Sequence, residues 1–413
     1  MFRFCRPCIL LFPMLAGASA QAQAPPLLEL HAQLAPMRAT RGDSEKRGAT
    51  PALMAVKHEL RDWIEAHLSR LAENGDEQAL AVRLNEELAG ADLFCKEKDN
   101  AKDRCAKDDG EWEGTGFLEP LHFERQESGG LLMVRTGLGI FCGEDESAYL
   151  YEWHDGRWQR LWQTEQTIEP SKPYAPQFIA GLRASRPDDK TGRRLVMSLG
   201  YAGWCTSNWR RVFYRLWRVD PAAAAGTLLL DQAEYAYIGA HDPPLEGSVG
   251  TADALVELTI GSLDAGVHSY EAVRHYAISG DRIERIDPVA LDPAAFTEEW
   301  LKNTWEQSAA WTPLRRRTFL RPWHIRFHAD FIRGEYIGQP QRCGKTPDLW
   351  QVGIDLKDVI EDKSSGIGYF FVTWQPPYHF EMIDIRSKPR ADCNQPAPPG
   401  EGLETLFPIQ GWR

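Results

Sequence analysis

Residues 149–162 read YLYEWHDGRWQRLW, and this stretch carries the clearest structural signal of the sequence. Its side chains alternate, which places Tyr149, Tyr151 and Trp153 on one face of an extended chain. Asp155-Gly156 then supplies a tight turn before the alternation resumes. The stretch therefore predicts a β-hairpin with an aromatic face that belongs to a core.

The same strand–turn–strand pattern recurs later in the chain. The later hairpins are predicted at Val212–Val219 with Thr227–Leu230, Val273–Ile278 with Arg282–Ile286, and Tyr369–Trp374 with Tyr378–Ile385. Each hairpin is also preceded by an apolar strand. These strands are Leu131–Thr136, Arg194–Leu199, Leu255–Ile260 and Leu349–Leu356. A unit of three strands is thus repeated along the sequence.

The units begin near residues 130, 194, 252 and 348, and a further unit fits around Trp323–Tyr336. Repeated antiparallel units of this size are typical of a β-propeller, in which small sheets surround a central axis. We therefore predict a mainly β, propeller-like fold of repeated antiparallel units for residues 115–413. The alternative is two β-sandwich or meander domains, because no WD or kelch motif marks the units.

Helical patterns flank and interrupt the β units. Residues 50–92 predict a helical hairpin that opens at Thr50-Pro51 and turns at Asn74-Gly75-Asp76. A further helix is predicted over Thr297–Ala309, before the last unit. Its predicted buried side chains are Trp300, Leu301 and Trp305.

Residues 1–20 have the pattern of a cleaved signal peptide. Arg3 and Arg6 supply positive charge ahead of the short apolar run Cys8–Leu15. Ala18-Ser19-Ala20 supplies the small residues that a signal peptidase requires. We therefore expect a periplasmic or secreted protein with a tether at residues 21–49, and no membrane span, since later apolar runs are short.

Six cysteines remain after the signal peptide, and an even number in an oxidising compartment predicts disulfide bonds. They are Cys95, Cys105, Cys142, Cys205, Cys343 and Cys393. Sequential pairing is our preference, with the first pair closing a charged loop at residues 93–114. A zinc site is disfavoured because no CxxC spacing occurs.

The charge balance is acidic, with 47 basic and 59 acidic residues and a net charge of −12. Phosphate groups would be repelled by such a chain as a whole. We therefore expect no nucleic-acid partner and no attraction to anionic membranes.

The stretch Trp323–Asp330 is the candidate for a metal site. If it forms a strand, His324, His328 and Asp330 share one face, and two histidines with a carboxylate can bind a metal ion or transfer protons. Arg326 lies between the histidines and would repel a cation. The alternative is a solvated polar face with an Arg–Asp pair, and we expect no cofactor.

The sequence contains 15 tryptophans, most of which we assign to β cores. Trp204 and Trp209 lie in the loop around Cys205 and are our candidates for an exposed aromatic surface that binds a ligand.

Motifs for nucleotide binding and for a serine hydrolase elbow are missing from the sequence. We therefore predict an exported, non-catalytic binding or interaction protein whose partner is a glycan or another exported protein. The alternative is a secreted hydrolase that acts on polysaccharide or cell-wall material through a pair of carboxylates. Sequence alone does not identify such a pair, and no catalytic residue is assigned.

Overall fold

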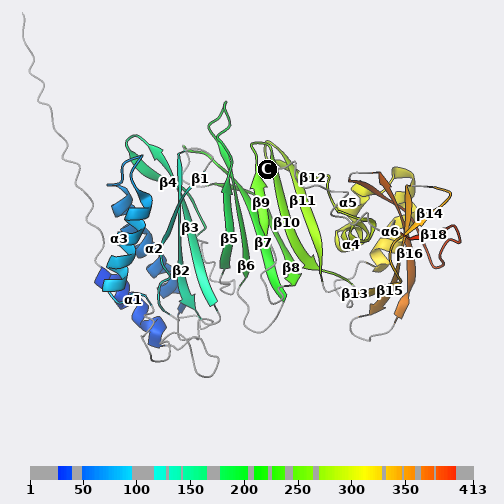
Figure 1. The fold of residues 1–413 in the computed structure, drawn as a ribbon, viewed down its shortest axis with the longest axis horizontal. Coiled ribbons are helices and arrows are strands. Elements are labelled where there is room, and N and C mark those ends of the chain that lie inside the picture. The colour runs from blue at the N-terminus through cyan, green and yellow to red at the C-terminus, as the bar shows by residue number, and fades with distance from the viewer. Residues whose placement is uncertain are drawn as a thin grey trace, which may run out of the picture.

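In the described part of the chain, the computed structural model contains three N-terminal helices, four antiparallel sheets and a helical segment between the third and fourth sheets (Figure 1). The structure describes residues 27–39, 49–94, 116–126, 130–140, 143–164, 177–202, 209–221, 226–237, 245–263, 269–327, 332–346, 348–358, 364–375 and 378–396. The prediction of a mainly β fold with repeated antiparallel units is confirmed.

The N-terminal helices are α1 (Leu27–Ala39), α2 (Ala49–Leu68) and α3 (Glu77–Gly90). Helix α3 begins at Asp76, whose carboxylate accepts a hydrogen bond from the amide of Ala79 at 2.8 Å. Helices α2 and α3 lie where the helical hairpin is expected. Helix α1 occupies part of the predicted tether, and this part is instead a packed helix. Its buried side chains, Leu30, Leu34 and Met37, follow helical spacing.

The four sheets follow one another along the chain. The first contains β1 (His122–Gln126), β2 (Leu131–Ile140), β3 (Gly143–His154) and β4 (Arg157–Gln163). The second contains β5 (Gln177–Ala184), β6 (Arg194–Ala202), β7 (Trp209–Val219) and β8 (Thr227–Tyr237). The third contains β9 (Glu246–Val249), β10 (Asp253–Gly261), β11 (Ser269–Ser279) and β12 (Arg282–Ile286). In these three sheets each strand pairs with the next in sequence.

The fourth sheet is larger and has the order β17-β16-β15-β14-β18, with β13 also paired to β15. Its strands are β13 (Ile332–Tyr336), β14 (Gln341–Cys343), β15 (Leu349–Asp358), β16 (Ser364–Gln375), β17 (His379–Arg386) and β18 (Cys393–Pro396). The four predicted hairpins and the apolar strands that precede them lie within these sheets. The sequence pattern missed β1, β5 and β9, which are the first strands of their sheets.

The hairpin of β3 and β4 turns through two residues, as its sequence predicts. Trp153 pairs with Trp158 and His154 with Arg157, which leaves Asp155-Gly156 as the loop. Both loop residues have positive φ, 50° and 78°, as a type I′ turn requires. Glycine is suited to the second position because its lack of a Cβ removes the steric penalty there.

The first three sheets stand side by side in a row, with the N-terminal helices at one end (Figure 1). One core joins the helices to the first sheet through Leu132, Tyr149 and Tyr151, and a second joins the first sheet to the second. A third core joins the second sheet to the third. Both faces of the first sheet and of the second sheet are therefore buried. This burial explains the long apolar runs in their strands.

The described strands form open sheets in a row and do not show a propeller. In a propeller the sheets surround an axis, so each sheet packs between two others. Here α1–α3 cover the outer face of the first sheet, and α4 (Pro293–Lys302) follows the third. The arrangement is consistent with the alternative of packed meanders. None of the described helices is long and apolar enough to cross a membrane.

A helical segment separates the third sheet from the fourth. It comprises α4, α5 (Trp305–Ser308), two short 3-10 turns at Ala309–Trp311 and Leu314–Arg316, and α6 (Arg317–Phe327). The single helix predicted over Thr297–Ala309 is thus wrong in extent. Asp292 and Pro293 start α4 earlier, and Thr304 forms a capping box with Gln307 that starts a new helix.

The strand predicted at Trp323–Asp330, and with it the extra unit at Trp323–Tyr336, is also wrong. Residues up to Phe327 belong to α6, and β13 is part of the fourth sheet. The buried residues of α6 are Leu320, His324 and Phe327. Their spacing of four and three residues is that of a helix face.

Candidate functional site

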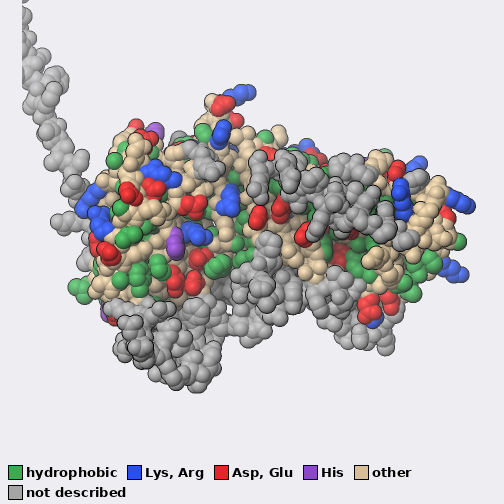
Figure 2. Space-filling view, in the orientation of Figure 1, with side chains coloured by type: hydrophobic (Ala, Val, Ile, Leu, Met, Phe, Trp, Pro, Cys, Tyr) green, Lys and Arg blue, Asp and Glu red, His purple; other side chains and the backbone are tan. Residues whose placement is uncertain are grey.

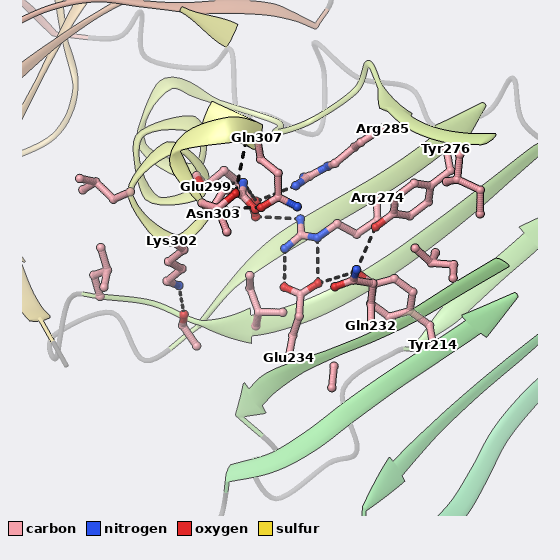
Figure 3. Close-up of a pocket in the computed structure, with 18 of the residues that line it drawn as sticks. Tyr214, Gln232, Glu234, Arg274, Tyr276, Arg285, Glu299, Lys302, Asn303 and Gln307 are labelled. Atoms are coloured by element: carbon pink, nitrogen blue, oxygen red, sulfur yellow. Dashed lines mark hydrogen bonds and ion pairs between the residues drawn. The ribbon is translucent and has the colours of Figure 1, made fainter. Parts of the chain in front are cut away.

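A pocket of about 980 Å³ lies where the second and third sheets meet the helices α4–α6 (Figure 3). Its volume is at the upper end of the range of about 300–1,000 Å³ that is usual for small-molecule sites. The walls come from β7, β8, β10, β11 and β12, together with α4, α5 and α6. Its labelled polar side chains are Tyr214, Gln232, Glu234, Arg274, Tyr276, Arg285, Glu299, Lys302, Asn303 and Gln307.

Arg274 on β11 is the centre of the charge network in this pocket (Figure 3). The residue is 4% exposed, and its Nε and Nη2 donate to the two carboxylate oxygens of Glu234 at 2.9 and 2.5 Å. Its Nη1 lies 2.7 Å from Oε1 of Glu299. One buried guanidinium therefore joins β8 of the second sheet to helix α4.

Glu299 is buried on α4 and has further partners. Nη1 of Arg285 donates to its Oε2 at 3.1 Å, and the hydroxyl of Tyr270 donates to its Oε1 at 3.1 Å. Two guanidinium groups and one hydroxyl thus compensate a carboxylate that has lost its water. This compensation explains how an acidic residue can occupy the buried face of a helix.

The neighbouring Glu298 is also buried on α4 and has its own set of partners. Its carboxylate accepts hydrogen bonds from the hydroxyls of Ser262 and Tyr336, both at 2.6 Å, and from the amide of Leu263 at 2.9 Å. Nζ of Lys302 lies 3.0 Å from its Oε2. Helix α4 is therefore tied by carboxylates to both neighbouring sheets.

The network keeps its groups charged. Burial alone would raise the pKa of Glu234, but the charge and hydrogen bonds of Arg274 and the hydrogen bond from Tyr214 lower it below its ordinary value. Burial alone would lower the pKa of Arg274, but the charges of Glu299 and Glu234 raise it well above the ordinary value.

The remaining walls combine hydroxyl, amide and apolar groups. The hydroxyl of Tyr214 donates to Glu234 at 2.8 Å and lies 3.3 Å from the hydroxyl of Tyr276. The Gln232 amide is half-buried at the pocket wall, with no hydrogen-bonding partner within the described ranges. Apolar surface comes from Leu229, Leu230, Ile260, Leu263, Ile283, Leu301 and Phe327. Such a site can hold a ligand by shape and hydrogen bonds.

The sequence analysis did not predict this pocket, although two of its acidic residues are unusual for their position in the sequence. Glu298 and Glu299 stand between Phe296 and Trp300 in a stretch that otherwise fits a buried helix. Charged residues are rarely buried without partners, so their presence there predicts cationic partners elsewhere. The identity of those partners depends on contacts between distant segments.

The proposed metal residues are not brought together by the described part of the structure. His324 is 1% exposed on α6, and its Nε2 lies 3.0 Å from the carbonyl oxygen of Trp300 and 3.2 Å from Oγ of Ser308. His328 and Asp330 lie outside the described residues. Across the described ranges, no group of three or more histidine, cysteine or acidic residues is placed to hold a metal ion.

The other candidate residues lie mostly beyond what the structure describes. Trp204 is outside the described residues, and Trp209 begins β7 with an undescribed side chain. The disulfide candidates outside the described residues are Cys95, Cys105, Cys142 and Cys205.

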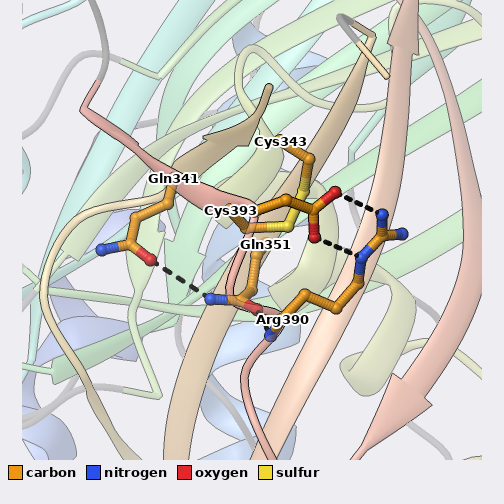
Figure 4. The surroundings of a disulfide bond; sticks show 6 residues. Gln341, Cys343, Gln351, Arg390 and Cys393 are labelled. Carbon is orange, nitrogen blue, oxygen red and sulfur yellow. Dashed lines mark hydrogen bonds and ion pairs between the residues drawn. A yellow bond between two sulfur atoms is a disulfide. The ribbon is translucent and has the colours of Figure 1, made fainter. Parts of the chain in front are cut away.

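Cys343 and Cys393 form a disulfide bond between β14 and β18 (Figure 4). Both cysteines are buried. Beside them, Gln351 on β15 accepts a hydrogen bond from the amide of Arg390 at 2.7 Å and donates one to Gln341 at 3.2 Å. This is the third pair of the predicted sequential pairing.

A second titratable group lies between the first and second sheets. Oε2 of Glu146 on β3 accepts a hydrogen bond from the amide of Ile179 on β5 at 2.5 Å. Burial raises the pKa of Glu146 to about 7, although this hydrogen bond and the charge of Arg135 oppose the shift. The ordinary value is 4.5, so the folded protein favours the protonated carboxyl.

We expect Glu146 to make stability depend on pH. Because its pKa is raised in the folded state, its contribution is full below pH 4.5 and is lost as the pH rises through about 7. The loss should be about 2–3 kcal/mol in the free energy of unfolding. Urea unfolding at several pH values should show a smaller loss in Glu146→Gln than in the wild type. The exposed Glu306→Gln serves as control, and parallel curves for all three proteins would contradict the assignment.

Comparison with known proteins gives no family for this chain. No model of a known protein family matches it, and no curated protein matches its sequence. The pocket geometry is therefore the basis on which a function is argued.

Proposed function

We propose that this chain is an exported, non-catalytic binding protein whose ligand occupies the pocket beside α4. The observation that carries the proposal is a pocket of about 980 Å³ whose charged groups are paired with one another. The signal-peptide pattern and the bond between Cys343 and Cys393 support export, since disulfides persist in oxidising compartments.

The charge balance of the site favours a ligand without net charge. The basic groups Arg274, Arg285 and Lys302 are matched by the acidic groups Glu234, Glu298 and Glu299. A charged ligand would have to compete with these internal pairs. A neutral ligand needs only hydrogen bonds and apolar contact.

A short glycan fits this description. Its hydroxyl groups can donate and accept hydrogen bonds at Gln232, Asn303 and similar amides in the wall. Its ring faces can pack against the apolar residues, such as Leu230 and Ile283, and against Tyr214. We therefore propose neutral glycans, including cell-wall fragments, as the ligand class.

The charge network also favours binding over hydrolysis. A glycoside hydrolase needs one carboxyl group that remains protonated to act as an acid. At Glu234 the pKa is lowered, because the charge of Arg274 outweighs burial, so this residue is unsuited to that role.

A thermal-shift screen of the mature protein tests the proposal. A neutral glycan at ~100 times its dissociation constant should stabilise the fold by about 2.7 kcal/mol. The shift should shrink in Gln232→Ala, which removes an amide from the wall. It should be retained in Leu228→Ala, on the same strand but outside the pocket. Equal shifts in both variants would place the ligand elsewhere.

A further inference from the structure

The segment at residues 311–327, WTPLRRRTFLRPWHIRF, has a composition unlike that of the whole chain. It contains five arginines and neither Asp nor Glu, whereas the full sequence carries a net charge of −12. Elsewhere the charges are mixed, and Figure 2 shows acidic and basic side chains next to one another over the N-terminal helices and first sheet. The segment is therefore a local basic region on an acidic protein.

The outer side of this segment exposes large apolar side chains. Leu314 is 79% exposed, Ile325 is 59% exposed and Phe319 is 49% exposed. The inner side packs through Leu320 and Phe327 into the core shared with the fourth sheet. Since the fold buries that inner side, the exposed residues are not needed to hold α6 in place.

The arginines flank these apolar residues. Arg315, Arg321 and Arg326 are exposed, and Arg315 and Arg321 form no ion pair with any described carboxylate. Arg317 and Arg321 lie one helical turn apart. They border an open hollow of about 730 Å³ whose other lining residues are Trp305, Thr318, Pro322 and Ile325.

We propose that the outer surface of residues 314–326, which we term the basic–apolar face, docks on a membrane surface that contains anionic phospholipids. Helices that combine arginines with exposed Leu, Phe and Ile side chains bind at the lipid–water boundary, where apolar groups enter and cations meet phosphate. The hollow between Trp305 and Arg317 is large enough for a phosphate headgroup with its glycerol. Charge complementarity selects an anionic surface, because Arg315 and Arg321 have no ion-pair partner among the described carboxylates.

Separate projecting apolar side chains favour a fluid membrane over an acidic protein. A protein partner would need preformed pockets for Leu314, Phe319 and Ile325, whereas acyl chains accommodate them without such complementarity. The docking surface is separate from the polar pocket, so it does not depend on the function proposed for that pocket.

Vesicle co-sedimentation of the mature protein tests this proposal. Vesicles of equal parts phosphatidylglycerol and phosphatidylcholine should bind the protein, pure phosphatidylcholine should not, and high salt should weaken binding. We expect Arg315→Glu/Arg321→Glu and Leu314→Ser/Phe319→Ser each to weaken binding by about tenfold or more. Arg186→Glu/Lys190→Glu makes the same charge change on the exposed loop after β5 and should bind like the wild type.

Thermal unfolding of each variant should match the wild type, because the substituted side chains are exposed. Absence of binding to anionic vesicles would overturn the proposal. Equal loss in the loop control would also overturn it, since net charge alone would then explain the attraction. Binding to a soluble acidic peptide but not to vesicles would assign the face to a protein partner and reject the membrane.

Discussion

Substitution of Arg274 by Met should lower the free energy of unfolding by about 3–5 kcal/mol. The change removes the group that compensates Glu234 and Glu299, and leaves two carboxylates without their main partner in a buried site. Urea unfolding at neutral pH measures the loss directly. The double variant Arg274→Met/Glu234→Leu should recover part of the stability, because it removes the unpaired carboxylate of Glu234 while Arg285 still compensates Glu299.

Arg215→Met is the matched control for this substitution. Arg215 lies on β7 and pairs with Asp231, whose side chain is 53% exposed, so its removal should cost no more than about 1 kcal/mol. Similar losses at Arg274 and Arg215 would contradict the buried network. If Arg274→Met does not fold, the double variant Arg274→Met/Glu234→Leu still decides the matter, since it should fold only when the unpaired carboxylate of Glu234 is the cause.

Removal of the disulfide by Cys343→Ala/Cys393→Ala should also destabilise the protein strongly. The bond closes a loop with a sequence separation of 50, for which the chain-entropy relation gives about 4 kcal/mol. The comparison is made by thermal and urea unfolding of the oxidised wild type and the double variant. Peptide mass mapping without reduction should show the link in the wild type.

The outcome is informative for the fold as well. The bond joins β14 to β18, which ends the described part of the chain. We expect the double variant to lose stability mainly in the fourth sheet, which hydrogen exchange can resolve. Equal stability of the two proteins would mean that this pair does not constrain the fold.

The hairpins could be predicted from sequence because their signals are local. Alternation along β3 and β4 and the turn at Asp155-Gly156 lie within one short stretch, and the structure confirms them. The same patterns do not say whether successive sheets form a row or a ring. That difference depends on what covers the outer faces of the first and third sheets. Here the α1–α3 helices lie at one end of the row and α4 follows the third sheet, and the sequence patterns of the strands do not predict this.

The error at α6 has a different cause. His324, Arg326 and His328 alternate with apolar residues, and this period of two predicts a strand. The same stretch contains Leu320, His324 and Phe327 at helical spacing, and burial follows this second pattern. Short segments can satisfy both periods, and packing against Trp300 and Phe370 favours the helix.

The candidate pocket could not be predicted, because its parts are distant in sequence. Glu234, Arg274 and Glu299 come from β8, β11 and α4, and only the packing of the sheets brings them together. The overall charge of the chain also led to a prediction that does not hold for every part of its surface. A net charge of −12 argues against anionic surfaces for the whole chain, yet it conceals the arginines of residues 311–327.

The central claim is that the pocket beside α4 binds a neutral glycan without cleaving it. Titration calorimetry of a glycan identified by thermal shift, with the wild type and Gln232→Trp, tests this most directly. Gln232 lies on the pocket face of β8 together with Glu234, so an indole there should fill part of the pocket volume and abolish binding, while Leu228→Trp on the same strand should bind normally. We predict this pattern, with the glycan recovered intact after the titration. Unchanged binding in Gln232→Trp, or recovery of a cleaved glycan, would contradict the account.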